Sequence, residues 1–174
     1  MKNSLTKPND SQIATDPREN FIYHSALMPI FVWIGFVCSI SFMEAWLKFR
    51  APGLSLSVGL SIGRVIFAAL NKVEWTFAGL TLLFLLLGKR KPKLAESIAL
   101  CIPIAILALQ TSFLLPALND RAAAISQGLS VSSSSVHFYY IFFESLKILS
   151  LFIFGINMVC GLSRDRKRKT VKEY

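Results

Sequence analysis

Four long runs of apolar residues constrain the fold of this chain more than any other feature of its sequence. The runs cover residues 26–47, 73–88, 94–118 and 137–162. About 20 helical residues cross a hydrocarbon core about 30 Å thick, so each run predicts a membrane-spanning helix, the second of them short. Only 17% of the residues are charged, whereas soluble domains carry about 25%. We therefore expect an all-α membrane protein with four transmembrane helices.

A fifth stretch, residues 54–70, combines a polar and an apolar face. Ser57, Ser61 and Arg64 follow one another at helical spacing, and Asn71 continues their face. The opposite face is apolar and consists of Val58, Ile62, Val65, Ile66 and Phe67. Such a pattern is typical of a helix that lies at a membrane interface. We expect one amphipathic helix here, interfacial or partly re-entrant, packed against the four spans.

The positions of lysine and arginine indicate how the chain crosses the membrane. With four crossings, one side holds three of them in residues 1–25, four in 89–93 and six in 163–174. The other side holds five, and one lies inside the fourth span. This excess on one side follows the positive-inside rule if both termini are cytoplasmic. Five crossings would place two basic segments outside, so we expect a multi-pass protein of the cell membrane with four crossings.

The two terminal segments differ in character. Residues 1–25 are polar without apolar periodicity, which predicts a solvated cytoplasmic tail. Residues 163–174 form a basic cytoplasmic tail that contains the run RDRKRK. This run either binds acidic lipid headgroups or acts only as the topology signal, and we favour the second interpretation. Membrane lipids are expected partners, and nucleic acid is not, because the basic residues lie beside the membrane.

Several polar residues fall inside the apolar runs, in the outer half of the membrane under this topology. His137, Tyr140, Glu144 and Lys147 follow at steps of three, four and three, which places them on one helical face. Lys147 lies about 15 Å along the span from His137, near the midplane. An ionised group there costs at least about 2.5–3.5 kcal/mol. Glu144 and Lys147 must therefore face protein or water.

Acidic and basic residues of this outer half balance in number. The set comprises Glu44, Glu74, Glu144, Arg64, Lys72 and Lys147. We expect a roughly neutral charged cluster, covered by the helix at 54–70. The candidate site for an ion or polar ligand consists of Glu44, Arg64, Asn71, Glu74, His137, Tyr140, Glu144 and Lys147. Three interpretations stay open: the charges fix helix packing, they line a polar cavity for ions, protons or a small polar ligand, or they contact a partner subunit.

We expect no cofactor, no metal site and no enzyme activity. Cys38, Cys101 and Cys160 all lie in apolar runs, which argues against disulfides and against a thiolate metal site. The two histidines, His24 and His137, fall at opposite ends of the membrane and so cannot bind one haem iron. The sequence contains no Gly-rich phosphate loop and no H-E-x-x-H motif.

Assembly with other chains is expected if the protein is a transporter. Four helices of this size rarely enclose a pore alone, so transport would require a homo-oligomer or a partner membrane protein. Gly59 and Gly63 form a G-x-x-x-G spacing, which permits close approach of helices. We favour packing inside the subunit over a dimer interface for this pair.

Four strings together resemble a family of small uncharacterised bacterial four-helix membrane proteins. They are SFMEAWLKFRAPG, GLSIGRVIFAALNKVEW, LQTSFLLPALNDRAAAISQG and HFYYIFFESLKIL, within residues 26–162. The chain is more distantly similar to the domain-of-unknown-function group that includes animal transmembrane protein 205. The resemblance implies four spans and a polar constellation at Glu44, Arg64, Asn71, Glu74, Arg121, Glu144 and Lys147. It implies a bacterial inner membrane as the location, and it implies no activity.

Two functions therefore stay open. The first is a transport-related membrane protein whose charged cluster binds an ion or a small polar solute. The second is a non-catalytic scaffold or assembly factor in which the same charges only fix helix packing.

Overall fold

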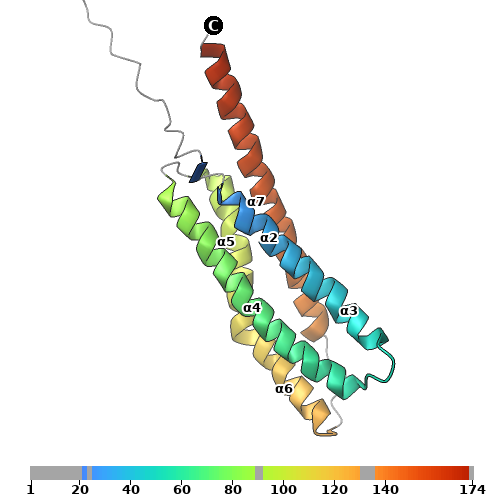
Figure 1. The fold of residues 1–174 in the computed structure, drawn as a ribbon. Coiled ribbons are helices and arrows are strands. Elements are labelled where there is room, and N and C mark those ends of the chain that lie inside the picture. The colour runs from blue at the N-terminus through green and yellow to red at the C-terminus, as the bar shows by residue number, and fades with distance from the viewer. Residues whose placement is uncertain (1–20, 23–24, 89–91, 130–135, 173–174) are drawn as a thin grey trace, which may run out of the picture.

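A computed structural model describes residues 21–22, 25–88, 92–129 and 136–172. These residues are mostly helical and include no strand, and four helical segments among them are long and apolar enough to cross a membrane. The expected all-α architecture with four spans is thus confirmed (Figure 1). The predicted solvated tail lies almost wholly outside the described residues.

The first span is one helical rod that changes its hydrogen-bond pattern along its length. It starts as the α-helix α2 (Leu27–Val37) and continues as the π-helix η1 (Cys38–Glu44). The short helices α3 (Ala45–Leu47) and η2 (Lys48–Arg50) complete it. The rod closely matches the expected span at 26–47. A π-helix within an α-helix is uncommon and often marks a functional site.

The second span, α4 (Leu56–Leu87), corrects the prediction for residues 54–70. We expected a separate amphipathic helix there, but these residues are the first half of a single helix that runs through Asn71 and Lys72. The Ser55 hydroxyl caps its start by accepting a hydrogen bond from the Val58 amide. No proline interrupts this stretch, and polar residues on one face do not break a helix. At about 1.5 Å per residue, α4 is about 48 Å long.

Neither of the two faces recognised at 54–70 packs inward as a whole. Val58, Ile62 and Val65 of the apolar face are exposed, and so is Arg64 of the polar face. The buried face instead begins with Gly59 and Gly63 and continues with Phe67, Leu70, Asn71 and Glu74. The small glycine positions therefore lie where α4 meets its neighbours, within the subunit.

The third span is again a rod with a π-helical segment inside it. It consists of α5 (Leu94–Leu109), η3 (Gln110–Leu114) and α6 (Leu115–Ser126). The Glu96 carboxylate accepts from the Lys93 amide and caps the start of α5. The rod extends beyond the expected end at residue 118, because the polar residues that follow continue the helix.

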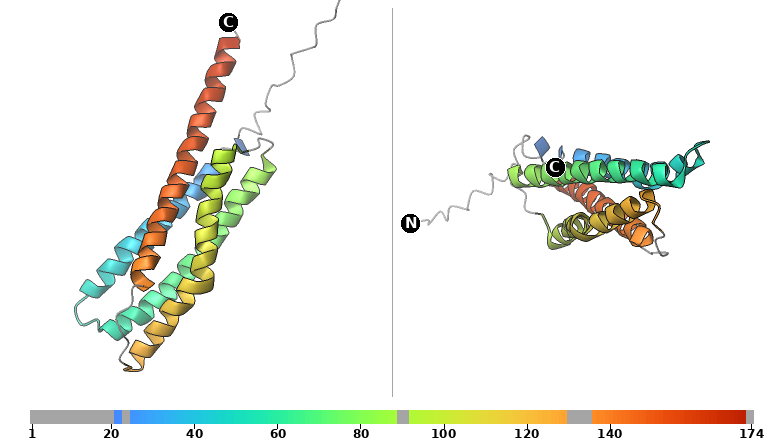
Figure 2. Two further views of the ribbon diagram at one scale, coloured as in Figure 1. Left: turned by 180° about the vertical axis from the view of Figure 1, so that it is seen from behind. Right: turned by 90° about the horizontal axis from the view of Figure 1, so that it is seen from below.

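The fourth span, α7 (Val136–Lys172), is the longest helix. Its apolar part is Phe138–Gly161, and the basic segment expected as a tail continues the same helix to Lys172. This end of α7 projects beyond the other helices, and α2 begins at the same end of the bundle (Figure 2). We call this the terminal end, and the end with the turn at Ala51 the turn end.

The helices pack in pairs around a layered interior. α7 packs against α2 and α5, and α4 packs against α2 and α6. Toward the terminal end lies a large apolar core with Trp33, Leu107, Leu151 and Phe154. A smaller apolar cluster toward the turn end contains Phe67, Leu70 and Tyr140.

A polar layer separates these two apolar clusters. On α4, Glu74 lies between Leu70 and Ala78, and on α7, Glu144 and Lys147 lie between Tyr140 and Leu151. Outward-facing residues of all four spans are largely apolar and exposed, as expected for contact with lipid. The chain is therefore a multi-pass membrane protein with a polar layer enclosed inside its bundle.

Candidate functional site

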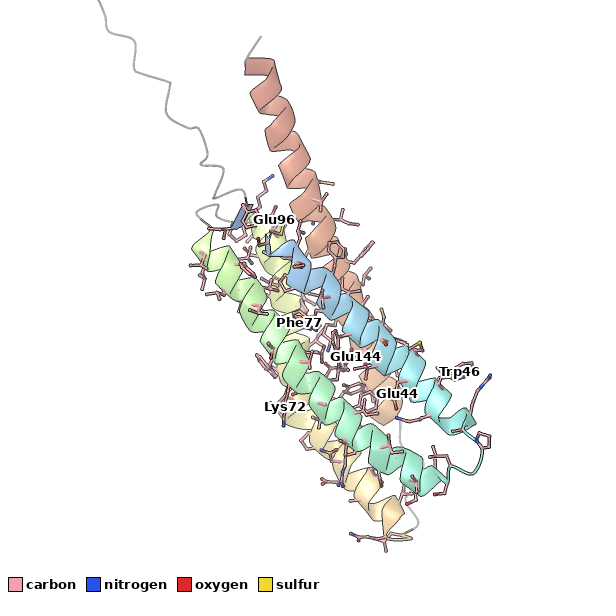
Figure 3. The ribbon with its side chains drawn as sticks, viewed as in Figure 1. Glu44, Trp46, Lys72, Phe77, Glu96 and Glu144 are labelled. Atoms are coloured by element: carbon pink, nitrogen blue, oxygen red, sulfur yellow. The ribbon has the colours of Figure 1, made fainter. Side chains whose placement is uncertain are left out.

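The Lys147 ammonium group is the centre of the polar layer. Its Nζ lies 2.5 Å from Glu74 Oε1 and 3.1 Å from Glu144 Oε1. It also donates a hydrogen bond of 2.7 Å to Gln110 Oε1. Lys147, Glu74 and Glu144 are each 0% exposed, and Glu144 lies inside the bundle, well away from either end (Figure 3). The three N–H donors of Lys147 thus have three acceptors in a site closed to lipid and solvent.

Two uncharged side chains complete the hydrogen bonding of the carboxylates. Gln110 Nε2 donates to Glu144 Oε1 at 3.0 Å, and Trp33 Nε1 donates to Glu74 Oε1 at 2.9 Å. We call Trp33, Glu74, Gln110, Glu144 and Lys147 the charge cluster. Its members come from α2, α4, η3 and α7, so it connects all four spans.

Two local features of the sequence bring these side chains together. Glu144 and Lys147 are three residues apart on α7, which puts them on one face. Gln110 and Thr111 are neighbours in η3, and both reach other helices, Gln110 in the charge cluster and Thr111 on α4. The π-helix has more residues per turn than an α-helix and so turns less per residue. The π-helix therefore helps two adjacent polar side chains to face the interior.

The charges in the cluster do not balance if every group is ionised. Two carboxylates and one ammonium group give a net charge of −1. Glu74 Oε2 and Glu144 Oε2 are both buried, and neither accepts a hydrogen bond from any protein group that the structure describes. Burying a carboxylate oxygen without a partner is costly. One further positive charge near these two oxygens would balance the cluster.

Asn71 and Tyr140, two of the predicted site residues, lie next to the cluster. Asn71 Nδ2 donates to Thr111 Oγ1 at 2.9 Å, and Trp75 Nε1 donates to the same oxygen at 3.0 Å. Tyr140 is buried one turn before Glu144 and packs edge-on against Phe67. It is near enough to Glu144 and Glu74 to interact electrostatically with both carboxylates.

Glu44 and Arg64, also predicted for the site, are not part of the cluster. Glu44 Oε2 forms an ion pair with Lys48 Nζ at 3.4 Å, near the turn end of the bundle (Figure 3). Arg64 is exposed on α4. Both residues lie closer to the turn end than Glu74 does, so the expected joint cluster with Glu144 and Lys147 does not form. Helix α7 includes His137, whose side chain lies outside the described part of the structure.

Gly63 explains how Lys48 lies across α4. A Cβ atom added at Gly63 would be 2.6 Å from Lys48 Nζ. The ammonium group of Lys48 also lies 5.2 Å from the centre of the Phe67 ring. Glycine at this position therefore leaves space for a side chain of the first span, and the close approach is within the subunit.

Gln110 and Trp33 are the two cluster members that the sequence-based site omitted. Gln110 offered a signal, since it is a polar residue inside an apolar run. Trp33 offered none, because a tryptophan in a membrane span is ordinarily an apolar core residue with an N–H group. Only its position opposite Glu74 shows that its N–H serves a carboxylate.

No set of three or more histidine, cysteine, aspartate or glutamate side chains among the described residues is arranged to hold a metal ion. The three cysteines are exposed on the outer surfaces of their helices. Comparison of the chain with protein-family models, with curated proteins and with solved structures found no match. The site is therefore interpreted from its own geometry.

Proposed function

We propose that this multi-pass membrane protein is transport-related, and that its charge cluster binds an ion near the middle of the bundle. The observation that carries this proposal is the sharing of Lys147 by two buried carboxylates, each of which keeps one oxygen without a partner among the protein groups that the structure describes. Ionisable residues inside membrane spans commonly mark pathways for ions or protons.

The energetics of buried charge support this proposal over a purely stabilising role. Replacing a buried ion pair by well-packed apolar residues is often neutral or stabilising in other proteins. Holding two carboxylates and one ammonium group in the bundle therefore contributes little net stability. A function that needs the charges gives a reason for their presence.

The setting that we propose follows from the sequence. The excess of basic residues on the terminal side favours a cell membrane orientation with both termini cytoplasmic. The resemblance to small bacterial four-helix membrane proteins favours a bacterial inner membrane. Transport by such a small bundle would take place in a homo-oligomer or with a partner membrane protein.

Ion flux into proteoliposomes tests the proposal. Full-length protein is reconstituted, and entry of protons, sodium and potassium is measured under an imposed gradient of each ion. Replacing Glu144 and Lys147 together by leucine should abolish the flux while the protein still folds. Glu44→Gln is the matched control, because Glu44 is a carboxylate of the same bundle outside the cluster, and it should retain the flux. Equal flux in the double-leucine variant would contradict the proposal.

A scaffold or assembly role is the second candidate, and one observation favours it. The cluster takes at least one hydrogen-bonding side chain from each of the four spans, so it fixes their register. In that case the double-leucine variant and the wild-type protein should show the same ion flux. Exchanging the two charges (Glu144→Lys with Lys147→Glu) should then recover much of the stability lost in Glu144→Ala.

A further inference from the structure

We propose, on the premise of the function proposed above, that the ion is a single proton shared between Glu74 and Glu144. In this state Lys147 is charged, one carboxyl is a carboxylic acid and the other is a carboxylate. The cluster is then neutral. Passing the proton on breaks one O–H bond and forms another on the accepting carboxylate, without any change of oxidation state.

The charge count around the site favours the addition of one proton. The titratable groups that face it are Glu74 from α4, and Tyr140, Glu144 and Lys147 from α7. Within the described residues, α2 and η3 bring only the uncharged side chains of Trp33 and Gln110. With Tyr140 neutral, the net charge is −1 between two apolar clusters. An unbalanced charge in such surroundings is strongly unfavourable, and one added proton removes it.

The positions of the hydrogen-bond donors favour the Oε2 atom of each carboxylate as the place where this proton adds. On each carboxylate, Oε1 receives two N–H donors: Lys147 and Gln110 at Glu144, and Lys147 and Trp33 at Glu74. On each carboxylate, Oε2 is buried and has no protein partner among the described residues. The two Oε2 atoms are therefore the places where a proton adds without displacing an existing hydrogen bond.

The closeness of the two carboxylates favours a proton shared between them. Both Oε1 atoms contact the same ammonium nitrogen, so they lie within about 6 Å of each other, a distance at which neighbouring charges strongly affect each other's ionisation. This closeness allows the two carboxyl groups to share one proton between them.

The same geometry disfavours the divalent cations Ca²⁺ and Mg²⁺. Calcium requires six to eight oxygen ligands, and magnesium about six in an octahedron. Within the described part of the chain, the cluster offers two carboxylate oxygens without a protein partner, and Lys147 already occupies the position between the two Oε1 atoms. A proton needs only one oxygen and no coordination shell.

Infrared spectroscopy of the full-length protein in lipid at neutral pH tests this proposal, with the spectrum of each variant compared with that of the wild type. The wild-type protein should show the C=O stretch of one buried carboxylic acid. Either Glu74→Gln or Glu144→Gln leaves one carboxylate beside Lys147, so in each variant the band should disappear. Lys147→Met leaves two carboxylates without a cation, so its band should double. Glu44→Gln, the control outside the cluster, should leave the band unchanged.

Each result decides the proposal. A wild-type protein without the band, or a band that both glutamine variants retain, would overturn it. The glutamine replacements preserve shape, so they test it even if Lys147→Met does not fold, and the wild-type spectrum alone tests it if no variant folds. A carboxylic acid band without proton flux would refute transport but not the shared proton. Flux of another ion without the band would refute the shared proton but not transport.

Discussion

Lys147 Nζ lies 2.5 Å from Glu74 Oε1, in an ion pair between α7 and α4 that is closed to both lipid and solvent. The same nitrogen contacts Glu144 one turn away on its own helix. A single cation thus holds two carboxylates from different spans.

Removing the Lys147 charge should destabilise the protein strongly. Lys147→Met leaves two buried carboxylates without their cation, and breaking a buried pair in this way costs about 3–5 kcal/mol. Thermal unfolding in detergent, followed by circular dichroism, measures the loss. Lys72→Met is the matched control, because Lys72 is exposed on α4, and it should have little effect. Equal stability of the two variants would contradict the central place of Lys147.

Removing the amide of Gln110 should weaken the cluster less. Gln110→Leu deletes an acceptor of Lys147 and a donor to Glu144. Leaving buried polar groups unpaired costs about 1–3 kcal/mol. The same unfolding measurement should show this loss, whereas Ser112→Leu, at an exposed position of η3, should change little. A stabilised Gln110→Leu variant would show that the amide does not serve the cluster.

The indole N–H of Trp33 connects α2 to the cluster. Trp33→Phe keeps a large aromatic ring but removes one hydrogen bond to the Glu74 carboxylate, and a hydrogen bond to a charged group contributes about 1.5–3 kcal/mol. Trp46→Phe is the control, since Trp46 is exposed. Unfolding curves of the two variants that coincide would rule out this role of Trp33.

Gly63 should accept alanine but not a large side chain. Alanine places its Cβ 2.6 Å from Lys48 Nζ, which is too close, but this nitrogen is the end of a flexible side chain that can move. The gain in helix propensity, about 0.5–1 kcal/mol, should therefore be partly lost at Gly63 and kept in Gly79→Ala, where an added Cβ meets no neighbour within 4 Å. Gly63→Leu should destabilise the protein. An unfolding midpoint of Gly63→Leu equal to the wild type would disprove close packing at this position.

The four spans could be predicted from the sequence because apolar run length is a direct consequence of membrane thickness. The pairing of Glu144 with Lys147 could also be predicted, since a spacing of three residues fixes their common face. The continuity of α4 was not predicted. The polar face at 54–70 indicated an interfacial helix, although no residue in this stretch ends a helix.

The exact membership of the cluster lay beyond sequence reasoning. Periodicity shows that residues share a helical face, but it does not show which helix that face meets. Glu44 therefore entered the predicted site although it pairs with Lys48 on its own rod. Gln110 was left out of that site although η3 brings it to Glu144.

A double-mutant cycle between Glu74 and Lys147 tests the central claim most directly. The free energy of unfolding is measured for the wild type, Glu74→Gln, Lys147→Met and the double variant. Residues in direct contact typically couple by about 0.5–3 kcal/mol. We predict coupling in this range, with the double variant more stable than Lys147→Met alone. Additive effects of the two replacements would show that Lys147 and Glu74 do not share a site.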